Sequence, residues 1–452
     1  MMTTNSRTVL VSAILISTLA ASRPAVSSAE DMVPAAISSY VAKAEPDFAW
    51  EVVDRQSNDL GTLIQLKVTS QKWHDVLWEH SVEVVQPVQL RYPEHALLFV
   101  TGGRQPPRPA SQDSIEQAQQ LAMASGMRVV VLHQVPNQPL FDNRFEDDAI
   151  TETWLRYLKD GDETWPLLFP MVKSAVKTMD AVQQLADQEF GGPIRSFVIT
   201  GASKRGWTSW LTPVVDTRIV GTAPIVIDVL NFRAQMKHQK DSWGKYSEQI
   251  IDYTSKGLIV EGEENTREKQ LRLMMDPYTY REQLTLPKLL INGVNDPYWV
   301  IDAQKLYWDD LRGPRYTLFL PNADHDLNDQ RTKALLTVAA FSSRLAAGRE
   351  MPELTWTTKR QDRDFEIAMT STEAPEQAVL WYGTSDNLDF RQSEFRSVPM
   401  KLSEDGKTWI GRFTPPKTHA AAVFAEFIFK ESTVPFSLTS LVFRDTIKPS
   451  EK

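Results

Sequence analysis

The chain has 452 residues, a formal net charge of −9 and no cysteine. Its length exceeds that of one ordinary core and predicts two or three domains, and its acidic balance excludes a typical nucleic-acid-binding protein. The lack of cysteine excludes disulfides, thiolate nucleophiles and cysteine-ligated metals. Because the seven histidines form no His-Glu-x-x-His pair, we expect neither a metal nor another cofactor.

The first 29 residues have the pattern of a signal peptide. Arg7 precedes an apolar run at residues 9–21, and small residues at 27–29 resemble a cleavage site. We therefore expect residues 1–29 to be removed and the mature chain to be periplasmic or secreted. An uncleaved membrane anchor is the alternative, although the run is short for a bilayer span. No later segment reaches spanning length, so we expect no span in the mature chain.

The elements that follow predict an α/β domain over residues 30–350. Three strand-like runs between residues 48 and 87 are separated by polar stretches at 58–61 and 71–79, which predicts antiparallel hairpins. After Pro93, short apolar runs alternate with long amphipathic segments, as is typical of a mostly parallel sheet with covering helices. The runs expected as strands lie at residues 96–100, 128–132, 196–200, 219–227, 288–291 and 316–320. The segments expected as helices lie at residues 114–125, 170–188, 204–211, 303–309 and 331–347.

Two long connections and a change of pattern define the rest of the chain. Residues 231–285 are polar and prone to form helices, which predicts a cap over a catalytic sheet, with a helical decoration away from the site as the alternative. Residues 137–170 carry several aromatic residues and are expected to form the other wall of a cleft. From residue 351 to 452, short alternating runs with turn signals predict a β-sandwich of the immunoglobulin or fibronectin type.

A nucleophile elbow is the strongest chemical signal. The apolar run at 196–200 leads into Gly201-Ala202-Ser203 and then into a predicted helix. Such a turn exposes a serine hydroxyl above the sheet, so we expect Ser203 to be a nucleophile on an α/β-hydrolase fold. Taken alone, Gly-x-Ser is usually an ordinary turn. The pattern is also a variant, because the second glycine, Gly206, is the third residue after the serine and Arg205 occupies a position that is normally small.

A base and a carboxylate follow in the order that this fold uses. Asp296 comes after the strand at 288–291, and His325 comes after the strand at 316–320. Loops past the carboxyl ends of parallel strands carry the active sites of open α/β sheets, so Ser203, Asp296 and His325 are expected to form a triad. Asp228, beyond the preceding strand, is the alternative acid.

The remaining site residues are expected around this triad. The backbone N–H of Lys204 is one expected oxyanion donor, and Gly103, or else Gly102, is expected to supply the other. Tyr298 and Trp299 directly follow the acid and are expected to line the substrate pocket.

Unusual strings carry a family resemblance. They are Gln-Val-Pro-Asn-Gln-Pro at residues 134–139 and Gly-Ala-Ser-Lys-Arg-Gly-Trp at 201–207. Shorter matching stretches lie at residues 98–103, 165–166, 170–173, 292–296 and 321–325. On these residues the chain resembles the PhoPQ-activated pathogenicity-related protein family within the α/β-hydrolase superfamily. The resemblance implies a fold related to prolyl and dipeptidyl peptidases, and the family also includes secreted eukaryotic proliferation repressors.

The sequence thus predicts an exported serine hydrolase that cleaves an ester or peptide bond through an acyl-enzyme. Its partner would be a small-molecule or peptide substrate and not a nucleic acid. The alternative is a secreted binding or signalling protein on a hydrolase scaffold, linked to virulence.

Overall fold

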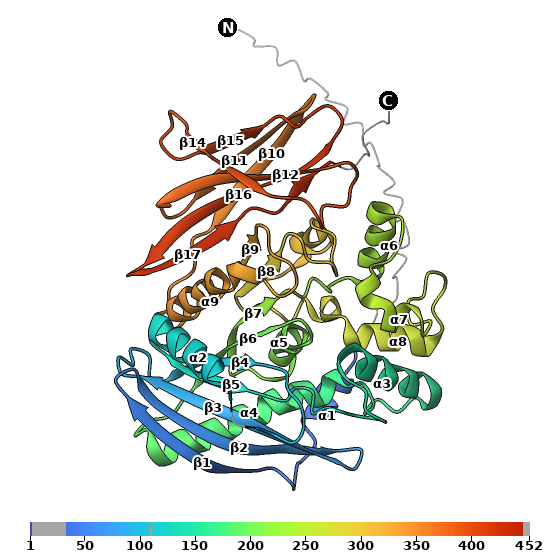
Figure 1. Cartoon of the computed structure of the whole chain (residues 1–452), viewed down its shortest axis with the longest axis vertical. Helices are drawn as coiled ribbons and strands as arrows, with labels where there is room; N and C mark the ends of the chain where they lie inside the picture. Colours follow the sequence, from blue (N-terminus) through green and yellow to red (C-terminus); the bar gives the residue numbers. More distant parts are fainter. Residues whose placement is uncertain (2–32, 109, 446–452) are drawn as a thin grey trace. The chain divides into compact units, whose positions relative to one another are not determined.

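A nine-stranded sheet forms the centre of the α/β part of the chain (Figure 1). The computed structural model describes Met1 and residues 33–108 and 110–445, so the predicted signal peptide, apart from Met1, lies outside the described residues. Residues from Pro34 onward form one compact unit. The strands are β1 (Ala49–Asn58), β2 (Gly61–Trp73), β3 (Val76–Pro87), β4 (His95–Val100), β5 (Arg128–Leu132), β6 (Ser196–Ala202), β7 (Ile219–Ile225), β8 (Lys288–Gly293) and β9 (Arg315–Leu320).

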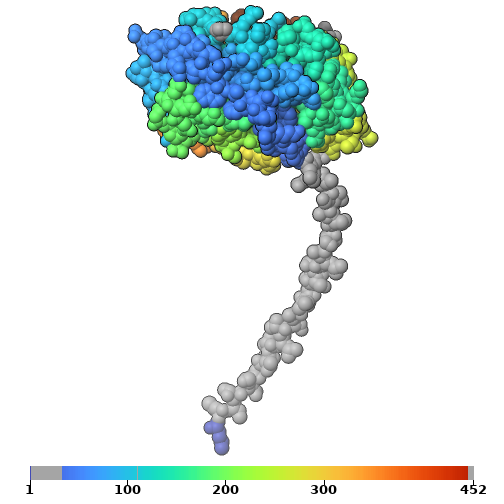
Figure 2. All heavy atoms as spheres, turned by 90° about the horizontal axis from the view of Figure 1, so that it is seen from below, coloured from blue at the N-terminus to red at the C-terminus, as the bar shows by residue number. Residues whose placement is uncertain are grey.

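The direction of the strands confirms a mostly parallel sheet of the α/β-hydrolase class. Their spatial order is β1-β2-β3-β5-β4-β6-β7-β8-β9. The first three strands and the β3–β5 pair are antiparallel, and every pair from β5 to β9 is parallel. The first strands, drawn in blue, cover much of the face shown in Figure 2.

Helices cover both faces of the sheet because its strands are apolar on both sides. Along β4, Leu98 belongs to a hydrophobic cluster that includes α4 and α5, whereas its neighbour Leu97 belongs to a cluster that includes α2 and α9. The alternation follows from the two-residue repeat of a strand. These helices are α1 (Ala36–Val41), α2 (Gln112–Ser125), α4 (Leu168–Glu189), α5 (Lys204–Val215) and α9 (Arg331–Ala346). None of the helices in the described part of the chain is long and apolar enough to cross a bilayer.

The two long connections form helices that lie together (Figure 1). The second contains α6 (Phe232–Trp243), α7 (Ile251–Thr254) and α8 (Thr266–Met275), with one 3-10 turn before α7 and another after α8. The first contains α3 (Glu146–Asp160), which contacts α7 and α8. We call α3, α6, α7 and α8 the cap.

Two antiparallel sheets form the C-terminal region. One has the order β10-β11-β15-β14 and the other the order β13-β12-β16-β17, with β18 paired to β16. Their bounds are β10 (Leu354–Gln361), β11 (Asp364–Ser371), β12 (Gln377–Ser385), β13 (Arg396–Pro399), β14 (Lys401–Leu402), β15 (Trp409–Phe413), β16 (Ala420–Glu431), β17 (Val434–Thr439) and β18 (Phe443–Arg444). Ile367 and Val423, one from each sheet, share a hydrophobic cluster with Val338 of α9, so the core of this region continues into the α/β part.

The structure differs from the expected elements at three places. The stretch at 71–79 is not a polar loop: β2 and β3 extend until only His74 and Asp75 form the turn, and both have the positive φ (42° and 67°) that tight hairpins favour. The strand expected to reach residue 227 ends at Ile225, where Val226 takes φ 47°. The helix expected at 303–309 is two 3-10 turns, because Tyr307 between them has a non-helical φ of −150°.

Candidate active site

Ser203 lies at the apex of a strained turn between β6 and α5. Its φ of 56° and ψ of −124° are unusual for a residue with a side chain, as expected of a nucleophile elbow. The turn depends on two glycines. A Cβ at Gly201 would lie 2.7 Å from the carbonyl oxygen of Arg205, and one at Gly206 would lie 2.9 Å from the carbonyl oxygen of Gly201. The helix therefore meets the strand at Gly206, which explains why glycine stands three residues after the serine.

Ser203, His325 and Asp296 are in sequential contact. His325, in the loop after β9, places Nε2 2.9 Å from Ser203 Oγ and Nδ1 2.8 Å from Asp296 Oδ2. Asp296, in the loop after β8, is 2% exposed, and its Oδ1 accepts the backbone N–H of Tyr298 at 2.8 Å. The Tyr298 ring packs against the imidazole, with 4.2 Å between the ring centroids. The arrangement can pass a proton from the hydroxyl to an imidazole that a buried carboxylate orients.

The alternative acid, Asp228, contacts a different side chain. It is 1% exposed and accepts a hydrogen bond from the Tyr307 hydroxyl. Burial raises the pKa of Asp228 to about 7, and the nearby carboxylates of Asp296 and Asp302 act in the same direction. The imidazole of His325 is hydrogen-bonded to Asp296, whereas the hydrogen bond of Asp228 is to Tyr307.

The expected oxyanion residues occupy two neighbouring segments. Lys204 is the first residue of α5, so its N–H is one of the donors that a helix start leaves unpaired. Gly103 has φ 148°, and the carbonyl of Gly102 accepts the N–H of Gln134 at 3.0 Å. A Cβ at Gly102 would lie 2.5 Å from Nη2 of Arg205, so this glycine makes room for that guanidinium.

An ion-pair network that the sequence did not reveal surrounds the elbow. Arg205 donates two hydrogen bonds to Glu146 at 2.8 and 2.7 Å, and its Nε donates to the carbonyl of Val135 at 2.5 Å. Burial acts to raise the pKa of Glu146, but Arg205 and Lys204 hold that pKa at about 2. The network ties the elbow to the start of α3. Acidic residues at the start of a helix, such as 146–148, are already explained by the favourable interaction of negative charge with the helix dipole. The sequence therefore gave no signal that Glu146 pairs with Arg205.

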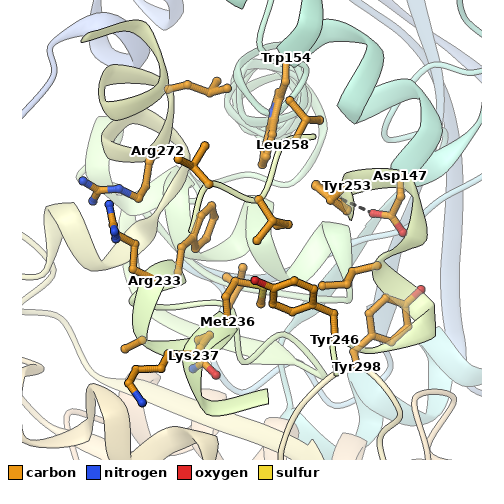
Figure 3. A pocket seen from close by; sticks show the side chains of 18 of the residues that line it. Asp147, Trp154, Arg233, Met236, Lys237, Tyr246, Tyr253, Leu258, Arg272 and Tyr298 are labelled. Carbon is orange, nitrogen blue, oxygen red and sulfur yellow. Dashed lines mark hydrogen bonds between the residues drawn. The ribbon is translucent and has the colours of Figure 1, made fainter. Parts of the chain in front are cut away.

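A pocket lies among residues of the cap helices (Figure 3). Its volume is about 500 Å³, and both Ser203 and His325 line it. Of the residues expected at oxyanion or substrate positions, Lys204, Tyr298 and Trp299 also line the pocket, whereas Gly102 and Gly103 belong to the loop beside Arg205. The lining includes residues of α6 and α8, which belong to the segment 231–285, and the role of this segment as a cover for the serine stays a prediction.

Comparisons place the chain among known proteins. A family model described as PhoPQ-activated pathogenicity-related protein matches residues 37–391. Autocrine proliferation repressor protein A of Dictyostelium discoideum is 32% identical over 332 residues, which are 70% of this chain and 66% of that protein. The alignment thus spans just under two thirds of the relative's length.

Solved structures that match part of the chain include two esterases. Acetyl xylan esterase 1 from Thermoanaerobacterium sp. JW/SL YS485 has a TM-score of 0.45 at 14% identity, over 69% of this chain and 92% of that one. Glucuronoyl esterase from Solibacter usitatus has a TM-score of 0.43 at 11% identity, over 68% of this chain and 91% of that one. The family model covers more than half of the chain, which therefore belongs to the PhoPQ-activated pathogenicity-related protein family.

Proposed function

We propose that this protein is a serine hydrolase that cleaves a carboxylic ester or amide through an acyl-enzyme. The observation that carries the proposal is the chain of contacts from Ser203 Oγ to His325 to Asp296, at a strained elbow beside a pocket. Strain at the nucleophile is maintained only where the surrounding structure fixes it, and here two close-packed glycines do so.

The proposed reaction has two steps. Ser203 Oγ attacks the carbonyl carbon while His325 Nε2 accepts its proton, and the tetrahedral oxyanion is stabilised by the N–H of Lys204 and one from the Gly102–Gly103 loop. The leaving alkoxide or amine takes the proton from His325. Water then attacks the acyl-enzyme with His325 again as base, which releases the acid and restores the serine. Asp296 remains a carboxylate throughout and keeps the imidazole oriented.

We also propose that the protein acts outside the cytoplasm, because the leader-like segment at 1–29 precedes the described unit. Fractionation of the producing cells and N-terminal sequencing test this, with a new N-terminus near Glu30 as the expected result. Recovery of the uncleaved chain in the cytoplasm would contradict it.

A fluorophosphonate probe tests the chemistry, since it reacts with an activated serine. The wild-type protein should be labelled, and Ser203→Ala should not. Ser57→Ala, which changes an exposed serine on β1, is the matched control and should be labelled like the wild type.

The second candidate is a binding or signalling role on the same scaffold. It is favoured by the name of the Dictyostelium relative, which describes an autocrine proliferation repressor. A folded wild-type protein that the probe does not label would refute the hydrolase proposal and support this second role.

A further inference from the structure

The pocket begins at the proposed nucleophile and is much larger than a triad needs. Ser203 and His325 line it together with cap residues, and its volume is about 500 Å³. Sites for small molecules usually enclose roughly 300–1,000 Å³. An acetyl group would leave most of this space empty, so the volume indicates a larger group attached to the scissile bond.

Apolar side chains from separate segments form the walls. Trp154 comes from α3, Trp207 from α5, Met236 from α6, and Leu258 from the loop between α7 and α8. Trp154 and Trp207 are only 5% and 4% exposed and pack edge to face. Walls of this kind favour methylene groups and disfavour peptide groups, because a buried amide without a hydrogen-bond partner is costly.

Several charged side chains that line the pocket form ion pairs with one another. Lys204 Nζ lies 2.8 Å from Asp147 Oδ2, and the other oxygen of Asp147 accepts the Tyr253 hydroxyl at 2.9 Å. Arg233, on the opposite side of the view in Figure 3 from Asp147, places Nη1 3.4 Å from Glu264 Oε2. A charged group on a ligand that lay against either pair would compete with a contact that the protein already satisfies.

We infer that the substrate is a carboxylic ester whose uncharged, extended apolar group fills this pocket. The inference rests on the proposed serine chemistry and names the class of substrate for that site. The apolar group is carried either by the acyl part or by the alcohol part of the ester, since both adjoin the bond that breaks.

A chain-length series tests the inference. We expect kcat/KM for p-nitrophenyl esters to rise about threefold for each of the methylenes added between acetate and octanoate, and thus by about 700-fold in total. If the alcohol part fills the pocket instead, octyl acetate should exceed ethyl acetate by a similar factor. Equal rates along both series would overturn the inference while leaving the hydrolase proposal intact. Failure of every ester together with failure of fluorophosphonate labelling would overturn the hydrolase proposal.

A variant that fills the pocket provides the second test. Met236→Trp enlarges a half-buried side chain near the middle of the pocket (Figure 3). It should lower kcat/KM for octanoate at least about tenfold more than it lowers kcat/KM for acetate. Met123→Trp, at an exposed position of α2, is the matched control and should change neither. Equal losses on acetate and octanoate, or none on either, would refute the inference.

Discussion

Replacement of Arg444 by methionine is expected to loosen three parts of the chain at once. Arg444 lies on β18, and its Nε is 2.8 Å from Asp302 Oδ1. Its Nη2 donates to Ser242 Oγ on α6 at 2.6 Å. Asp302 belongs to the loop after β8 that also carries Asp296. A single buried guanidinium therefore joins the C-terminal sheets, the cap and the loop of the proposed acid.

The expected loss in the free energy of unfolding follows from the burial of the Arg444–Asp302 ion pair. Both side chains are only 3% exposed, and removing one partner of a buried ion pair usually costs about 3–5 kcal/mol. Asp302 keeps two other partners, His238 Nε2 at 2.6 Å and Lys305 Nζ at 2.5 Å. We therefore expect a smaller loss, about 2 kcal/mol in the free energy of unfolding. Adding Asp302→Asn to Arg444→Met removes the carboxylate charge that has lost its partner. The double variant should recover about 1 kcal/mol of the lost free energy of unfolding.

Urea unfolding followed by tryptophan fluorescence measures this effect at neutral pH. Arg396→Met, which removes an exposed arginine from β13, is the control and should leave the midpoint unchanged. Burial acts to raise the pKa of Asp302, but His238 and Arg444 hold it well below its usual range. The stabilisation is therefore present above about pH 4 and should fade as the pH falls further. An Arg444→Met midpoint equal to the wild-type midpoint at neutral pH would refute the reasoning.

Three further predictions concern the groups around the serine. Asp296→Asn should lower kcat/KM by about three orders of magnitude, and Asp228→Asn should leave it within about threefold; a larger loss for Asp228→Asn than for Asp296→Asn would make Asp228 the acid. The pKa of Asp228 is raised to about 7, so the stability from its protonated form is present below about pH 4 and lost as the pH rises through 7. Urea unfolding should show the free energy of unfolding of Asp228→Asn gaining about 4 kcal/mol on that of the wild type between pH 4 and 8, and a constant difference would contradict this. Arg205→Lys keeps the charge but loses the two-pronged contact with Glu146, so kcat/KM should fall about tenfold, while the exposed control Arg195→Lys stays at the wild-type value.

The main elements of the sheet could be predicted because local patterns encode them. Strands such as β5 and β9 are short apolar runs bounded by turns, and β4 to β9 alternate with helical segments, which leaves few topologies other than a parallel sheet. The positions of Asp296 and His325 followed from the same logic. Each comes soon after the carboxyl end of a strand, and those ends meet at one edge of the sheet.

Side-chain pairs between distant segments could not be predicted. Arg205 and Glu146 are 59 residues apart, and neither has a spacing that indicates the other. The need for glycine at 102 follows from the path of the Arg205 side chain and not from a turn signal. The pocket could not be predicted for a related reason. The hydrophobic pattern of an amphipathic helix is the same whether an apolar residue such as Met236 faces a packed core or a cavity.

Electrostatics explains why only one of three neighbouring carboxyl groups suits the imidazole. Asp228, Asp296 and Asp302 are all buried, and three bare charges so close together would repel strongly. Burial and its neighbours raise the pKa of Asp228 to about 7, so below that pH it is predominantly neutral beside the Tyr307 hydroxyl. The charge of Asp302 is compensated by Arg444 and Lys305. Of the three carboxyl groups, Asp296 is the one that is hydrogen-bonded to the His325 imidazole. Its negative charge can therefore stabilise the imidazolium that forms during acyl transfer.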